Sequence, residues 1–144
     1  MKIFKRNGNV KKVLEPLFRG YVFVETDQDY RSFQEHLNTQ IKPVKGFIRL
    51  LRRDHTGDET VLPHERAFIE RFTDQRRVID VSIGIIVGDH VVVTEGPLQG
   101  LESMIVKVDR HKRTALLEMD FFDRIQTVEV GLEVIEKIKS LDTD

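Results

Sequence analysis

The sequence predicts an α+β protein, with mixed strands and helices in the N-terminal half and a small antiparallel β-barrel in the C-terminal half. Two observations predict this fold. Residues 88–124 contain three short runs rich in β-branched residues, separated by two tight-turn signals, which is the pattern of a small curled sheet. Residues 1–73 instead alternate strand-like and helix-like patterns of apolar residues, as mixed domains do.

The N-terminal half is predicted from turn signals and periodicity. Asn7-Gly8-Asn9 is a hairpin signal. Apolar residues at helical spacing follow Asp29, and Pro43 ends that pattern. The expected elements, in order, are a hairpin over 2–6 and 10–14, a strand over 17–25, a helix from 29 to 43, a strand over 47–51 and a helix from Pro63.

The C-terminal half is predicted to hold strands at 91–94, 103–108 and 114–119, closed by segments 128–130 and 134–138. We interpret residues 1–73 as the first domain, 74–86 as a short linker and 87–144 as the barrel. The apolar run inside the linker can add a strand to either neighbour.

Composition limits the class of protein. There is no cysteine, which excludes disulfides and thiolate metal sites. No apolar run approaches the roughly 20 residues of a membrane span, so we expect no membrane association. The first residues are charged but lack the apolar core of a signal peptide. We expect a cytoplasmic protein.

Charge is unevenly distributed along the chain. Residues 1–86 hold 16 Lys and Arg against 12 Asp and Glu, whereas residues 87–144 hold 7 against 12. A nearly neutral protein with local basic clusters is steered to particular points on an anionic partner.

The most concentrated basic cluster is the predicted turn Arg110-His111-Lys112-Arg113. Cationic side chains at a hairpin tip can each reach a different phosphate, and arginine can also stack on an unpaired base. Lys107 and Arg124 are candidates to extend this patch. The alternative is that an exposed turn is charged only because it is solvated.

Catalytic patterns are missing from the sequence. The five histidines are scattered without metal-ligand spacing, and neither a glycine-rich phosphate loop nor a nucleophile elbow occurs. We therefore expect no enzyme activity, no catalytic residues, no metal and no cofactor.

Two motifs resemble one known family. Residues 88–102, GDHVVVTEGPLQGLE, resemble the KOW motif of the NusG-type transcription elongation factors, and residues 16–24, PLFRGYVFV, resemble the signature of their N-terminal (NGN) domain. The resemblance implies an NGN-like α/β sandwich followed by a KOW-type β-barrel. Residues 107–115 resemble the specialised LoaP group, whose members are processive antiterminators associated with an RNA hairpin.

The resemblance implies a function and its residues. It implies a transcription antitermination and elongation factor that binds RNA polymerase and structured nascent RNA, with non-template DNA as a further partner. The implied polymerase-binding residues are Leu17, Phe18 and Tyr21, and the implied RNA-binding residues are Lys107, Arg110, His111, Lys112, Arg113 and Arg124. Phe122 and Leu132 match positions that face protein partners such as Rho or a ribosomal protein.

Two alternatives stay open. One is a general NusG-like adaptor, whose barrel binds protein and whose basic loop is only a solvated turn. The acidic balance of residues 87–144 favours it. The other is a ribosome-associated KOW protein, against which the signature at residues 16–24 argues.

The chain also departs from the family pattern. Arg19 stands where proline is usual, Leu132 where phenylalanine is usual, and Ser103 and Asp123 where glycines are usual. A turn that needed a positive φ would be strained at the last two positions, so we expect a different local geometry there.

The family's first strand and first helix, which normally precede the region of Lys2, have no counterpart in this sequence. Without them the N-terminal sheet is expected to leave unpaired backbone groups and open apolar surface. Either the chain begins late or another segment fills the gap. We expect a monomer, with a domain-swapped oligomer as the alternative.

Overall fold

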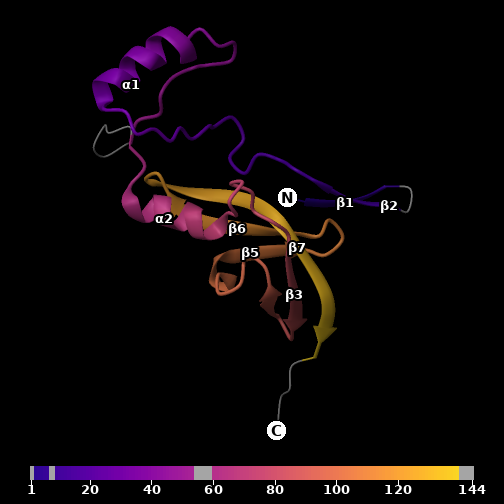
Figure 1. Ribbon diagram of the computed structural model, residues 1–144. Helices are drawn as coiled ribbons and strands as arrows, with labels where there is room; N and C mark the ends of the chain where they lie inside the picture. Colours follow the sequence, from indigo (N-terminus) through magenta and orange to yellow (C-terminus); the bar gives the residue numbers. More distant parts are fainter. Residues whose placement is uncertain (1, 7–8, 54–59, 140–144) are drawn as a thin grey trace. The chain divides into compact units, whose positions relative to one another are not determined.

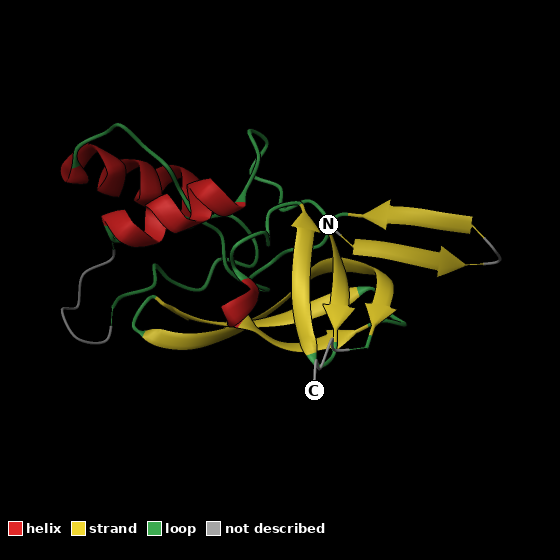
Figure 2. Cartoon of the chain, turned by 90° about the horizontal axis from the view of Figure 1, so that it is seen from below, coloured by secondary structure: helices red, strands yellow, loops and turns green. Residues whose placement is uncertain are grey.

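A five-stranded sheet forms the C-terminal half of the computed structural model, which describes residues 2–6, 9–53 and 60–139 (Figure 1). Its strands follow one another along the chain but are ordered β4-β3-β7-β6-β5 in space. They are β3 (Ser82–Val87), β4 (His90–Glu95), β5 (Ile105–Asp109), β6 (Thr114–Phe121) and β7 (Arg124–Ile138). A 3-10 turn, η2 (Glu102–Met104), precedes β5. Figure 2 shows that the strands curl rather than lie flat.

Strand β7 pairs with two different neighbours. Its first half runs antiparallel to β6, as far as the pair Thr114 and Gly131. Its second half runs parallel to β3, beginning at the pair Ser82 and Leu132. The two predicted closing segments are therefore one continuous strand. The apolar run of the predicted linker becomes β3 and joins the C-terminal sheet.

The core lies on one face of these strands. Along β6, Ala115, Leu117, Met119 and Phe121 are buried, whereas Glu118 and Asp120 between them are exposed. This alternation is the pattern of a sheet with one face covered. The sequence places apolar residues at every second position here, so the register keeps the apolar set inside.

The loop after β4 closes one end of the core. Leu98 has no exposed surface, and its N–H donates to the buried Ser82 hydroxyl at 2.9 Å. Gly96 brings the backbone close to Ser82 with a φ of +104°; a Cβ there would stand 2.7 Å from the Ser82 Cα. Only glycine combines this φ with so close an approach.

Two N-terminal elements belong to the same compact unit as the sheet, which comprises Met1–Leu17 and Val61–Asp144. The hairpin of β1 (Lys2–Arg6) and β2 (Asn9–Val13) confirms the predicted strands, and its turn residues 7–8 lie outside the described residues. Lys2 Nζ contacts Glu15 Oε2 and Glu129 Oε1 of β7, each at 2.6 Å. Helix α2 (Pro63–Phe72) begins at the predicted proline.

Phe18–Thr60 form the second unit. Asp29 caps helix α1 (Tyr30–His36) by accepting the Ser32 N–H at 2.7 Å, as the sequence predicts. A short π-helix, η1 (Leu37–Ile41), continues α1 up to the predicted stop. The polar loop predicted over residues 52–58 lies largely outside the described residues.

The predicted strands over 17–25 and 47–51 are not strands in the structure. Both segments have strand-forming residues, but a strand needs a hydrogen-bonded neighbour, and within the described residues neither segment is paired in a ladder. Apolar side chains are correspondingly exposed, among them Val22 at 89% and Ile48 at 90%. Large apolar side chains are therefore exposed on both of these segments.

The two compact units also divide the chain differently from the predicted boundaries at residues 73 and 86. The α2 helix and the β1–β2 hairpin group with the C-terminal sheet. Lys2 pairs with Glu129 of β7, and the Glu65 carboxylate of α2 accepts the Phe122 N–H at the turn between β6 and β7.

The close approach at Gly96 gives a test of the loop. We expect Gly96→Ala to lower the free energy of unfolding by about 3 kcal/mol, because both φ strain and the contact with Ser82 must be relieved. Gly100→Ala is the control: its φ is +81°, but the nearest atom is 3.7 Å away, so it should cost about 1 to 2 kcal/mol. Urea unfolding measures both, and equal losses would contradict the steric argument.

Candidate nucleic-acid interface

The basic loop, residues 110–113, is the turn that joins β5 to β6. Arg110, His111 and Lys112 are exposed, and Arg113 is half-buried. Because β5 and β6 pair without a shift from Lys107 and Leu116 to Asp109 and Thr114, the loop is held at the end of a paired hairpin.

Two hydrogen bonds shape the basic loop. The Asp109 carboxylate accepts the Lys112 N–H at 2.9 Å, which closes the turn. Arg113 then adopts a left-handed backbone with φ of +57°. Its carbonyl accepts the Leu132 N–H of β7 at 3.0 Å, at the point where β7 changes partner. The tip is thus tied to the sheet at both of its ends.

The positively charged side chains of the basic loop remain available to an anionic ligand. The pKa of Asp109 lies below its ordinary value because it accepts the Lys112 N–H and because the charges of Lys112 and His111 lie close by. Within the described residues, no carboxylate lies within 4.0 Å of a cationic nitrogen of the basic loop. An anionic ligand would meet uncommitted side-chain donors here.

The structure brings Lys107 close to the basic loop but separates Arg124 from it. Lys107 is exposed on β5, two residues before Asp109. Arg124 pairs with Phe121 at the opposite end of β6, roughly 23 Å away at about 3.3 Å per residue. The expectation that Arg124 extends the same patch is therefore corrected.

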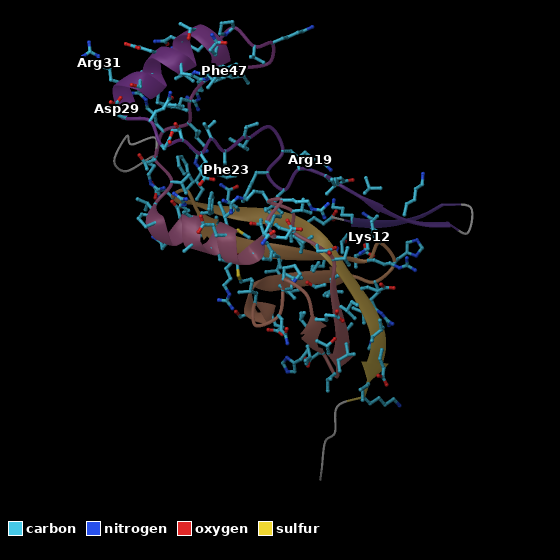
Figure 3. All side chains as sticks on the ribbon, viewed as in Figure 1. Lys12, Arg19, Phe23, Asp29, Arg31 and Phe47 are labelled. Carbon is cyan, nitrogen blue, oxygen red and sulfur yellow. The ribbon has the colours of Figure 1, made fainter. Side chains whose placement is uncertain are left out.

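The predicted polymerase-binding residues lie at a partly exposed apolar surface. Leu17 and Phe18 are half-buried, and Tyr21 is 54% exposed. The Phe18 ring meets the Phe23 ring edge-on at a centroid distance of 5.7 Å. Figure 3 labels Phe23 on this extended segment. Phe23, which the sequence analysis did not single out, is 49% exposed beside Phe18.

The predicted partner-binding residues are buried. Leu132 has no exposed surface and fills the core of the C-terminal sheet, and Phe122 is 8% exposed. Matching a family position does not reveal burial, which depends on what the rest of the chain places against that position. Neither side chain is offered to a partner in this conformation.

The turn that carries Phe122 corrects a second expectation. Phe122 and Asp123 have φ of +55° and +61°, so the turn keeps left-handed residues where the usual glycine is replaced. Asparagine and aspartate tolerate this conformation better than most residues, whereas phenylalanine does so at a cost. The strain is retained rather than avoided by another geometry.

Other kinds of site are not evident in the described ranges. No group of three or more His, Cys, Asp or Glu residues there is close enough to hold a metal ion. None of the helices in those ranges has the length and hydrophobicity that crossing a membrane requires.

The fold and the glycine-dependent loop define a KOW-containing protein: the KOW motif model matches residues 87–126. Curated relatives extend the similarity over most of the chain. The transcription termination/antitermination protein NusG of Staphylococcus carnosus is 32% identical over 136 residues, covering 92% of this chain and 71% of its own length. The Lactococcus lactis protein of that name is 29% identical and covers 93% and 69%.

A third NusG protein, from Synechocystis, is 31% identical over 134 residues and covers 85% of this chain and 62% of its own length. The similarity thus includes the N-terminal half as well as the KOW segment. The chain belongs to the NusG family.

The Asp109 turn gives a test of how the basic loop is built. We expect Asp109→Ala to speed hydrogen exchange of the Lys112 amide, because the acceptor is lost, whereas Asp109→Asn keeps an acceptor and should preserve protection. Since the folded pKa is depressed, the turn is stabilised above the ordinary carboxyl pKa and loses that stabilisation as pH falls through the folded pKa. An NMR titration should therefore place the Asp109 midpoint below 3.8.

Proposed function

We propose that this chain is a transcription antitermination and elongation factor that binds RNA polymerase through its N-terminal half and structured nascent RNA through the basic loop. It acts in the cytoplasm and catalyses no covalent chemistry. By binding the elongating state of the polymerase better than the paused state, it shifts the balance between them. The family membership and the exposed basic loop support this proposal.

The basic loop carries the RNA part of the proposal. Arg110, His111 and Lys112 project from a turn whose backbone is fixed by Asp109 and by β7. A fixed tip places several donors at set positions before RNA arrives, so little ordering cost opposes binding. Lys107, which is exposed on β5 close to the loop, adds a fifth cationic or titratable group to the four of residues 110–113.

The exposed apolar surface supports the polymerase part. Tyr21 and Phe23 combine an aromatic ring with about half of their surface exposed, and aromatic residues dominate the energy of protein interfaces. We also propose an NGN-like domain for residues 1–73, and non-template DNA as a contact of the basic N-terminal segment.

We place the chain in the LoaP group of the family as the finer proposal. Its support is the sequence of residues 107–115, which provides a cationic turn inside an otherwise acidic C-terminal half. A general partner-binding module has no need of such a turn.

A protein adaptor is the second candidate function. The outer face of β6 carries exposed Glu118 and Asp120, and Glu136 is exposed on β7. These carboxylates repel RNA and would attract a basic protein. If the adaptor function is correct, the basic loop contributes only solubility.

The first test measures RNA binding. We expect the triple variant R110A/K112A/R113A to bind a labelled leader hairpin at least tenfold more weakly at 0.1 M salt. We also expect the slope of log affinity against log salt to become shallower by about two. Each phosphate contact that is lost removes the release of about one counterion on binding.

A charge-matched control separates local contacts from net charge. The triple variant R31A/K42A/K45A also removes three exposed cations, all from the second compact unit. It should keep most of the RNA affinity. Equal losses in both triple variants would show nonspecific attraction, and an unchanged affinity in the loop variant would favour the adaptor.

The second test measures polymerase binding. We expect Tyr21→Ala to weaken binding to purified RNA polymerase about tenfold, because a half-exposed aromatic anchor is removed. Tyr30→Ala, which removes a tyrosine that is 69% exposed on α1, should have little effect. A loss of equal size for the two variants in a pull-down titration would place the docking surface elsewhere.

A further inference from the structure

The basic loop stands at the end of a hairpin whose strands lose their other neighbours before the turn. Strand β5 lies at one edge of the sheet, so no described strand pairs with its other side. The ladder between β6 and β7 ends at Thr114 and Gly131, and the rest of β7 pairs with β3. Figure 1 shows β7 curving along this course. Within the described residues, the end of the hairpin is therefore a two-stranded ribbon.

Cationic side chains lie on both strands of this ribbon. Lys107 is exposed on β5, and Arg110 is exposed directly after that strand. On the other side, Lys112 is exposed and Arg113 is half-buried where the chain enters β6. A ribbon with cations on both strands can contact phosphates on its two sides at once. Two facing rows of phosphates are what the groove of a double helix presents.

The ribbon offers no aromatic platform for single-stranded RNA. Residues 73–120, which include β3, β4, β5 and nearly all of β6, contain no phenylalanine, tyrosine or tryptophan. Phe121 and Phe122 lie at the far end of β6 and are 5% and 8% exposed. Proteins that bind single strands stack successive bases on aromatic side chains. A helical RNA with a regular backbone therefore suits this loop better than an unpaired strand does.

Acidic side chains oppose the binding of RNA along the body of the sheet. Glu118 and Asp120 are exposed on the outer face of β6. Glu129 of β7 is also exposed, and it pairs with Lys2 at 2.6 Å. These carboxylates repel a phosphate backbone that lies over the strands. We therefore expect the RNA to meet the ribbon end-on, at the basic loop.

The width of the ribbon limits the helices that it can enter. A two-stranded ribbon fits the major groove of B-form DNA, which is about 12 Å wide. The corresponding groove of an uninterrupted RNA helix is deep and too narrow for side chains to read. The loop is held in shape, because Asp109 accepts the Lys112 N–H and the Arg113 carbonyl accepts the Leu132 N–H. The RNA must therefore supply the space, and unpaired nucleotides do so by interrupting the stacked helix.

We propose that the basic loop enters the deep groove of an RNA stem at a bulge or internal loop. Cations on the two strands of the ribbon contact the phosphates on the two sides of the widened groove, and Arg110 at the tip reaches a purine N7. The ligand is thus an interrupted RNA helix, not a terminal loop or a fully paired stem. This inference rests on the proposed RNA-binding function and adds the class of RNA that the loop selects.

Binding of the full chain to matched RNAs tests the inference. Three versions of the labelled leader RNA are compared: a hairpin with a short bulge in its stem, the same hairpin with a fully paired stem, and an unpaired strand carrying the same loop sequence. We expect the bulged hairpin to bind about tenfold more tightly than either of the others. The variant R110A/K112A/R113A should lose this preference, and the charge-matched control R31A/K42A/K45A should keep it.

Small changes in the RNA show which groove the loop occupies. Purine N7 lies in the deep groove, whereas the 2′-hydroxyl groups line the shallow one. We expect 7-deazapurines in the base pairs beside the bulge to weaken binding about fivefold, because an arginine in the deep groove loses its acceptor. Methyl groups on the 2′-oxygens of the same nucleotides should change the affinity by less than about twofold.

Four results would overturn the inference while leaving nucleic-acid binding intact. These are equal affinity for the bulged and fully paired stems, tightest binding to the unpaired strand, sensitivity to 2′-O-methyl groups without sensitivity to 7-deazapurines, and equal affinity for a DNA hairpin of the same sequence. A chain that binds none of the three RNAs would contradict the proposed RNA-binding function itself.

Discussion

The shared strand β7 is the constraint on which the C-terminal sheet depends. Along its own length, β7 exchanges its antiparallel ladder with β6 for a parallel ladder with β3, and the exchange occurs between Gly131 and Leu132. Where β7 changes from β6 to β3, its backbone N–H and C=O groups are not all paired in either ladder. They therefore need hydrogen-bond partners from outside the ladders. The carbonyl of Arg113 accepts the Leu132 N–H there. The basic loop is therefore part of the junction as well as a surface turn.

This connection explains how a cationic loop persists on an acidic half of the chain. The carboxylates of Glu118 and Asp120 point outward from β6 and lie along the sheet rather than against the tip. Asp109 is the carboxylate next to the loop, and it is engaged with the Lys112 N–H. The net charge of this half is consequently a poor guide to phosphate binding. The charges that a phosphate would contact are those of a few side chains whose positions the backbone fixes.

Local patterns predicted those parts of the fold whose partners are close in sequence. The hairpin at residues 2–13, the cap at Asp29, the helix start at Pro63 and the buried alternation of β6 all follow from neighbouring residues. The segments 17–25 and 47–51 were predicted to be strands and are not, because strand formation requires a partner that no local pattern guarantees.

The candidate site divides in the same way. The basic loop was predicted because a turn and its charges are adjacent in sequence. The prediction wrongly grouped Arg124 with the basic loop. Arg124 pairs with Phe121 at the end of β6, whereas the loop precedes Thr114 at the start of that strand. The burial of Leu132 and the bridge made by Glu65 were not predicted, since each depends on contacts between residues distant in sequence.

The parallel pairing of β3 with the second half of β7 also sets an order of assembly during synthesis. Strand β3 leaves the ribosome about fifty residues before its neighbour Leu132–Ile138, whereas β4 and β6 each find an antiparallel neighbour close by in the chain. Until translation passes residue 138, one edge of β3 has no strand to pair with. Unpaired strand edges are sites at which nascent chains aggregate. The last strand of the C-terminal sheet to be made is therefore the one that protects the first strand of that sheet.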